Sequence, residues 1–124
     1  MKTTIILGAS NKAERYSYLA LNKLEEHGHP IYLVHPSLSE IREHKVYPEL
    51  NKIPLNSDVK IDTITLYLSP KHLEPLIVEI IKIKPKRVIF NPGTELPQSY
   101  EQLKKSGIEV LEACTLVLLN TNQY

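Results

Sequence analysis

Short apolar runs alternate along the chain with stretches in which apolar side chains recur every three or four positions. The runs contain many β-branched residues and end at glycine, proline, asparagine or serine, a pattern that predicts buried strands. Five such strands are predicted: Thr3–Leu7, Ile31–Val34, Thr63–Leu68, Arg87–Phe90 and Ile108–Leu111. The shorter stretch Lys45–Tyr47 predicts a short edge segment.

The stretches between these strands predict helices. In the first, Tyr16, Leu19, Ala20 and Leu24 fall on one helical face, and Gly28 ends the helix. The others are a single turn over Pro48–Leu50, a helix that follows Ser69-Pro70 and buries Leu73, Leu76, Ile77, Ile80 and Ile81 before Pro85, and a weaker helix over Leu96–Lys105 that ends at Gly107. Thr115–Leu119 fits a helix and a strand equally well.

Strands separated by helices pair in parallel, through right-handed crossovers. The pattern therefore predicts an α/β fold: a single Rossmann-like, doubly wound sheet, mainly parallel, of about five strands, in one domain over residues 1–124. Ligands of such sheets bind beyond the carboxyl ends of the strands. The loops to inspect are Gly8–Ser17, His35–Ser37, Ser69–Lys71, Asn91–Glu95 and Glu112–Thr115.

Composition narrows the class of protein. The 124 residues are 42% hydrophobic, and 15 basic against 14 acidic side chains give a formal charge of +1, without the basic excess of a nucleic-acid-binding module. No apolar run is long enough for a transmembrane helix. A single cysteine forms neither an intrachain disulfide nor a cysteine-based zinc site. We expect a cytoplasmic protein that binds neither nucleic acid nor membranes.

The first loop, Gly8-Ala9-Ser10-Asn11-Lys12-Ala13, stands where a dinucleotide-binding fingerprint would stand. Ser10 and Ala13 replace the second and third glycines of that fingerprint, and the loop is not a P-loop either. A serine hydroxyl and free backbone N–H groups at a helix start nevertheless suit a phosphate. The alternative is that Gly8 only provides a strand-to-helix turn.

The end of the second strand argues against NAD, because His35-Pro36-Ser37 stands where a dehydrogenase carries an acidic residue for the ribose diol. A phosphorylated ribose would tolerate this better. The alternative is a capped loop with a surface histidine.

No catalytic or metal-binding constellation is evident. None of the five histidines has the spacing of a metal motif. Cys114 follows the last strand and is either a reactive thiol or an inert small hydrophobe. Glu95 either caps the following helix or points into the cleft.

Taken together, the loops resemble the small stand-alone CoA-binding proteins, which are similar to the CoA-binding domain of the succinyl-CoA synthetase alpha subunit. The resemblance rests on Ile6–Ser10, Glu14–Tyr18, Val34–Pro36, Val46–Pro48, Ile53-Pro54, Leu68–Pro70, Asn91–Glu95 and Ala113–Thr115, in that order, and covers essentially the whole chain. It also implies that the first helix begins near Ser17.

The resemblance implies a site for coenzyme A or an acyl-CoA. Gly8, Ala9 and Ser10, with Arg15 and Ser17 nearby, would hold the pyrophosphate, and His35 and Pro36 would face the ribose 3′-phosphate. Ser69, Pro70, Asn91, Pro92, Gly93, Thr94 and Glu95 would line the adenine and pantetheine side, with Cys114 near the thiol end. His35 departs from the asparagine that relatives more often carry there.

Two synthetase parts do not fit in 124 residues: the domain with the phosphorylated histidine and the nucleotide-grasp partner subunit. We therefore expect a CoA-binding module without complete catalytic machinery, with no catalytic residue and no metal ligand assigned. The competing hypotheses are an NAD(P)-linked enzyme, a Cys114-dependent acyl transferase, and a partner-binding domain without a ligand. A homodimer is left open.

Overall fold

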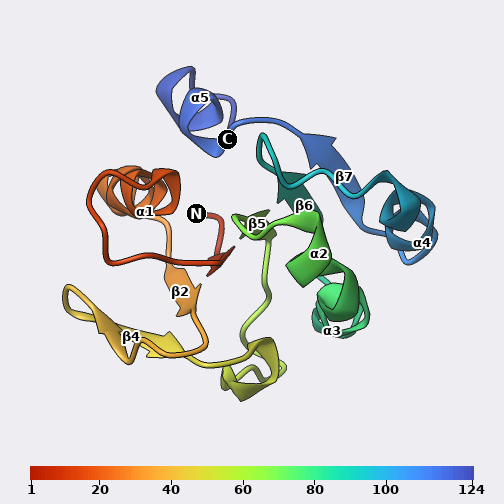
Figure 1. The fold of residues 1–124 in the computed structure, drawn as a ribbon, viewed down its shortest axis with the longest axis horizontal. Helices are drawn as coiled ribbons and strands as arrows, with labels where there is room; N and C mark the ends of the chain where they lie inside the picture. The colour runs from red at the N-terminus through yellow and green to blue at the C-terminus, as the bar shows by residue number, and fades with distance from the viewer.

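The computed structural model describes all 124 residues, as one sheet with helices on both faces (Figure 1). Its strands are β1 (Thr4–Leu7), β2 (Ile31–Val34), β3 (Glu40–Ile41), β4 (His44–Tyr47), β5 (Thr63–Leu66), β6 (Arg87–Phe90) and β7 (Glu109–Glu112). Its helices are α1 (Tyr16–Glu26), α2 (Pro70–Leu73), α3 (Ile77–Ile83), α4 (Tyr100–Lys105) and α5 (Thr115–Asn120), with 3₁₀ turns η1 (Leu50–Lys52), η2 (Glu74–Leu76) and η3 (Pro97–Ser99).

The strand order is β3-β4-β2-β1-β5-β6-β7, and every pairing is parallel except that of β3 with β4. The chain builds outward from β1 to β2 and β4, then returns to the other side of β1 and continues with β5, β6 and β7. The order therefore reverses between β1 and β5, which is where an open α/β sheet leaves a crevice for a ligand. The fold is the predicted Rossmann-like, doubly wound α/β sheet.

One face of the sheet carries the larger of two apolar clusters. Ile5, Leu7, Ile64, Leu66 and Phe90 point to this face and belong to a cluster of 16 buried residues that α2, α3 and α4 cover (Figure 1). Alternate residues of the same strands point to the other face, which α1 and α5 cover. The apolar cluster on that second face has only 8 residues, because the strands also place polar side chains there.

Several polar side chains on the second face lie at the amino ends of the central strands. Thr4, Thr63 and Arg87 occupy neighbouring register positions on β1, β5 and β6. Arg87 is 7% exposed and donates from Nε to Thr63 Oγ1 at 2.7 Å, while its Nη2 has no hydrogen-bond partner. Tyr124 covers this row: its ring centroid lies 4.4 Å from the Arg87 guanidinium, and its hydroxyl lies 2.6 Å from Thr4 Oγ1.

Two further side chains complete what we call the amino-end cluster, formed by Lys2, Thr4, His29, Arg87 and Tyr124. Lys2 Nζ donates to the main-chain oxygen of Tyr124 at 2.6 Å, and the Lys2 N–H donates to His29 Nδ1 at 3.0 Å. The His29 ring meets the Tyr124 ring edge-on, with centroids 5.0 Å apart. The two ends of the chain thus close the amino end of the sheet.

The sheet has seven strands rather than about five. The additional strands are β3 and β4, joined by a hairpin in which Arg42 adopts a positive φ of 54°. The segment predicted at the edge is β4, which lies inside, between β2 and β3. The sequence indicates β4 only as a short edge segment, and the two residues of β3 are too few to show an alternating pattern.

The predicted helix after Ser69 is divided into α2, η2 and α3, because Pro75 lacks the N–H of a continuous helix. The turn expected at Pro48–Leu50 lies slightly later, at Leu50–Lys52, and the ambiguous Thr115–Leu119 is helical in α5. Helix α1 begins at Tyr16, one residue before the expected Ser17. None of the helices has both the length and the apolar character that a membrane span requires.

Candidate functional site

A cavity of about 930 Å³ opens at the carboxyl ends of the central strands, where the strand order reverses. This volume lies within the range of small-molecule sites, roughly 300–1,000 Å³. Most of the predicted site residues line it: Gly8, Ala9, Ser10, Arg15, Ser17, His35, Pro36, Ser69, Pro92, Gly93 and Thr94. Four do not line it: Pro70, Asn91, Glu95 and Cys114.

Gly8 makes the turn that opens the cavity. Its φ is +95°, a region that residues with a Cβ avoid, and an added Cβ would lie 2.9 Å from the carbonyl carbon of Tyr67. The N–H groups of Gly8 and Ala9 both donate to the carbonyl of Val34, at 3.2 and 3.1 Å. The loop is therefore bound to β2 on one side and packed against the end of β5 on the other.

The loop between β1 and α1 is rich in unused donors. Ser10 Oγ accepts the Lys12 N–H at 3.1 Å, so the serine shapes the loop while its own O–H stays free to donate. The N–H groups of Tyr16 and Ser17 begin the 11-residue helix α1, which has no side-chain cap and no acidic residue in its first turn. Such an end carries partial positive charge and favours an anion.

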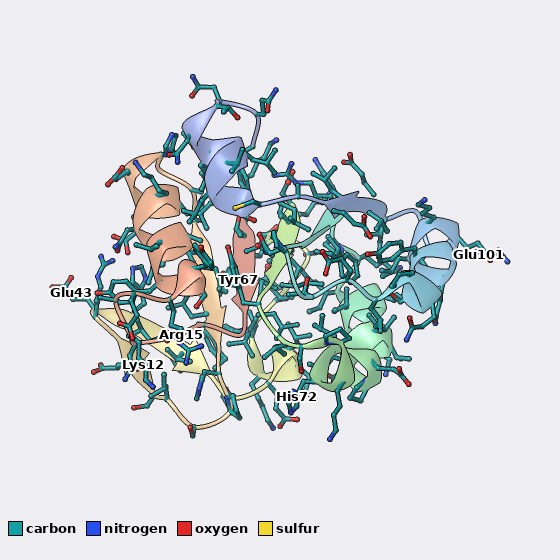
Figure 2. The ribbon with its side chains drawn as sticks, turned by 45° about the horizontal axis from the view of Figure 1, so that its top comes forward. Lys12, Arg15, Glu43, Tyr67, His72 and Glu101 are labelled. Atoms are coloured by element: carbon teal, nitrogen blue, oxygen red, sulfur yellow. The ribbon has the colours of Figure 1, made fainter.

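Two cationic side chains flank this helix start. Lys12 and Arg15 line the cavity and take part in none of the four salt bridges of the protein. Figure 2 shows both on the loop that leads into α1, with Tyr67 near the middle of the sheet. Backbone donors, a hydroxyl and two unpaired cations thus face the same volume, an arrangement that suits a phosphorylated ligand.

His35, at the end of β2, is held in one tautomer. Its Nδ1 accepts the N–H groups of Ser37 and Leu38, both at 3.0 Å, and therefore carries no proton. The ring proton is on Nε2, so His35 offers the cavity one neutral N–H donor. The histidine in this way caps its own loop and also lines the site.

Across the cavity, Ser69 and His72 are hydrogen-bonded, with Ser69 Oγ 2.8 Å from His72 Nδ1. They lie three residues apart on the first turn of α2, and no acidic side chain hydrogen-bonds to the imidazole. Ser69 is the N-terminal flanking residue of α2, as predicted, but its hydroxyl does not cap the backbone. Next to them, burial raises the pKa of Tyr67 to about 12, so this cavity-lining phenol stays protonated.

Three of the residues outside the cavity have other contacts. Asn91 is 4% exposed, and its side chain hydrogen-bonds only within the protein. Its Nδ2 donates to Thr65 Oγ1 and the Leu66 carbonyl at 2.7 and 2.8 Å, and its Oδ1 accepts the Thr115 N–H at 2.9 Å. Glu95 accepts the Gly93 N–H at 2.9 Å and so shapes its own turn. Cys114 is half-buried just before α5.

Sequence reasoning missed the wall formed by the end of β4, η1 and α3. Pro48, Glu49, Leu50, Leu76 and Glu79 line the cavity there. Glu49 places a carboxylate near the end of β2. Because Glu49 follows the neighbouring strand β4 in the sequence, the residues directly after β2 do not reveal it. A prediction of β4 beside β2 would have identified it.

The chain is similar to known proteins in sequence and in fold. The sequence profile of a family described as CoA binding domain matches residues 2–120. A crystal structure of an uncharacterized protein is 38% identical, with a TM-score of 0.85, over 100% of this chain and 98% of the other. A hypothetical protein from Pyrococcus horikoshii OT3 is 27% identical, with a TM-score of 0.82, over 96% and 82%. No curated protein matches by sequence.

The fold also occurs inside a larger enzyme. The dinucleotide-forming acetyl-coenzyme A synthetase 1 of Ca. Korarchaeum cryptofilum matches with a TM-score of 0.71 and 19% identity. The match covers 90% of this chain but only 25% of the synthetase chain. At this identity the likeness concerns the fold alone.

Proposed function

The chain belongs to the CoA binding domain family, and from that premise we propose that its main cavity binds coenzyme A or an acyl-CoA. The observation that carries the proposal is the set of unused donors between β1 and α1. Ser10, Lys12 and Arg15 line the same cavity as the uncapped start of α1. A pyrophosphate would satisfy these donors, which the protein itself leaves without acceptors.

The ribose end of the ligand would lie near His35 and Pro36. The Nε2–H of His35 donates without a positive charge, which suits one phosphate oxygen beside the cationic loop. Glu49, which also lines the cavity, offers an acceptor for a ribose hydroxyl. An NAD-type diol is therefore less strongly excluded than the sequence alone suggests, and NAD stays the alternative ligand to test.

We propose a binding module rather than a catalyst. Ser69 and His72 form a hydrogen-bonded nucleophile and base, but a local pair three residues apart with no orienting acid lacks the third member of such machinery. Cys114 lies outside the cavity lining. Its position near the thiol end of the ligand stays a prediction, as do the cytoplasmic location and the absence of membrane and nucleic-acid partners.

Calorimetric titration of the whole chain with CoA, dephospho-CoA and NAD tests the proposal. We expect CoA to bind most tightly, dephospho-CoA more weakly because it lacks the 3′-phosphate, and NAD most weakly. NAD binding more tightly than CoA would contradict it. Ser10→Ala should weaken CoA binding by about 1–2 kcal/mol if the hydroxyl donates to phosphate.

A second measurement tests the catalytic alternative. Acetyl-CoA is incubated with the protein and the released thiol is followed with a chromogenic disulfide, with Ser69→Ala as the matched control. We expect the same slow background with both proteins and with buffer. Thiol release that depends on Ser69 would make the protein a thioesterase.

A further inference from the structure

The charges that line the main cavity are divided between its two sides. Lys12 and Arg15 lie on the β1–α1 side. Glu49 lies just after β4, and Glu79 lies in the first turn of α3. Carboxylates repel a phosphate, so we expect the part of the ligand that lies against them to carry no negative charge and to donate hydrogen bonds. In a CoA-type ligand the exocyclic amino group of the adenine meets both requirements.

A second cavity, of about 370 Å³, shares two of its lining residues with the main cavity. Leu50 and Glu79 line both cavities, so the smaller one adjoins the larger at these two residues. Five of its nine lining residues are apolar, Ile53, Val59 and Ile83 among them, and they come from η1, the segment that follows it and α3. Asn51, Asn56 and Lys82 line it as well, so the smaller cavity offers apolar surface beside Glu79 together with amide groups and one cation.

Glu79 is placed to serve as an acceptor. Its side chain is half-buried and takes part in no hydrogen bond or salt bridge of the protein, although Lys82 stands three residues later on the same helix. A partly desolvated carboxylate without a partner gains the most from a donor that a ligand supplies.

We propose that the smaller cavity receives the purine base of the ligand and that Glu79 selects a 6-aminopurine by accepting from its exocyclic amino group. The inference rests on the proposed function, and it leaves the pantetheine, rather than the adenine, beside Ser69 and the Pro92–Thr94 turn. A flat base has apolar faces for the walls and a polar edge for Glu79. An aliphatic acyl chain would leave the carboxylate facing hydrocarbon, at a cost in desolvation, so the base is the better occupant.

The first experiment compares CoA with its deaminated analogue, in which hypoxanthine replaces adenine, by calorimetric titration of the whole chain. The analogue presents a carbonyl oxygen where adenine presents an amino group, and this oxygen would face the Glu79 carboxylate. We expect wild-type protein to bind CoA about ten- to a hundredfold more tightly than the analogue, the range for a hydrogen bond to a charged group.

The matched variants are Glu79→Gln and Glu74→Gln. A glutamine side chain accepts from an amino group or donates to a carbonyl, so Glu79→Gln should reduce the discrimination to less than about threefold. Glu74 is exposed and lies outside both cavities, so Glu74→Gln should keep the wild-type ratio. Equal binding of the two ligands by wild-type protein would overturn the inference and leave the proposed function standing. Binding of neither would overturn both.

A second variant tests where the base lies. Val59→Trp fills the smaller cavity from a half-buried position on its wall. We expect at least a tenfold loss of CoA affinity, with thermal unfolding measured alongside to show that the protein remains folded. Unchanged CoA affinity in folded Val59→Trp would place the base elsewhere. Tighter binding of a long-chain acyl-CoA than of CoA, lost in this variant, would make the smaller cavity an acyl site and overturn the inference.

Discussion

The two ends of the sheet carry similar groups but differ in what the protein does with them. At the carboxyl end, Lys12 and Arg15 flank an uncapped helix start and a large cavity. At the amino end, the amino-end cluster brings Lys2, His29 and Arg87 around Tyr124, which fills the space over them. One end is open and the other is closed by the chain itself.

The difference teaches that basic residues alone do not mark a ligand site. At the amino end the aromatic ring, the main-chain oxygen of Tyr124 and the threonine hydroxyls serve as partners for the basic groups. At the carboxyl end the chain supplies no such partner, and the donors remain available. We therefore expect substitutions at the carboxyl end to change ligand affinity and those at the amino end to change stability.

The largest effect is expected at Gly8, where stability and ligand affinity should be lost together. Gly8→Ala places a Cβ at a positive φ and against the Tyr67 backbone. We expect the unfolding free energy to fall by about 2–5 kcal/mol and CoA binding to be abolished. Denaturant unfolding and calorimetry measure both. Gly107→Ala is the control, because Gly107 has a similar φ of +83° with nothing near its missing Cβ. Equal losses in the two variants would mean that the close approach at Gly8 has no special role.

Removing the Tyr124 ring should open the closed end. Tyr124→Ala takes away a largely buried aromatic ring and leaves Arg87 without its cover, so we expect about 2–3 kcal/mol of destabilisation in chemical denaturation. CoA affinity should stay within twofold. Tyr16 is a matched tyrosine at the open end, 70% exposed, and Tyr16→Ala should leave stability nearly unchanged. A fall in CoA affinity in Tyr124→Ala would show that the two ends are coupled.

Removing a cation at the open end should affect affinity alone. Arg15→Ala should weaken CoA binding by about 1.5 kcal/mol, toward the low end for charged hydrogen bonds because Arg15 is exposed, without lowering the melting temperature. Lys105→Ala removes an exposed cation on α4, outside the cavity, and should bind CoA as wild type does. A melting temperature that falls in Arg15→Ala with unchanged affinity would make Arg15 structural.

The smallest effect concerns pH at the closed end. Burial, followed by the charges of His27, Lys2 and Arg87, lowers the pKa of His29 below its ordinary 6.5. The unfolded chain then binds more protons than the folded one just below pH 6.5, so stability should fall as the pH drops from 7.5 to 5.5, by less than about 1 kcal/mol. His29→Asn keeps an acceptor for the Lys2 N–H and should flatten the unfolding free energy over this range. An unchanged slope in the variant would assign the titration to another group.

Glu25 should titrate in a separate window. Burial raises the pKa of its carboxyl, but hydrogen bonds from Arg42 and His44 at 2.7 and 2.6 Å outweigh burial, so the net pKa is lowered. Its contribution to stability is therefore lost only as the pH falls below about 4.5. The two losses can thus be measured separately in one pH series.

The fold was largely predictable because the five predicted strands are short apolar runs and the segments between them show helical periodicity. The hairpin of β3 and β4 was only partly predictable. The segment of β4 is visible in the sequence, whereas the two residues of β3 carry no pattern, and the turn between them depends on tertiary contacts such as the Glu25–Arg42 pair. The break at Pro75 was visible in the sequence, but the regular spacing of Leu73, Leu76 and Ile80 outweighed it in the prediction.

The lining of the main cavity was predictable where it follows directly from strand ends and less so where it depends on neighbouring elements. The loop from Gly8 to Ser17 and the turn at Pro92–Thr94 line the cavity as expected. Asn91 does not, because its amide is used between β5 and α5, which no local pattern reveals. Glu49 and Glu79 reach the cavity only because β4 and α3 pack where they do.

The position of β1 in the sheet has a consequence for how the protein folds during its synthesis. Strand β1 is a central one, and the strands β2, β4, β5, β6 and β7 each pair with a strand that precedes them in the chain. The sheet can therefore grow outward on both sides as the chain lengthens, without waiting for its last residues. Tyr124 packs over Arg87 and follows every strand of the sheet in the chain, so we expect the sheet to form before its amino end is closed.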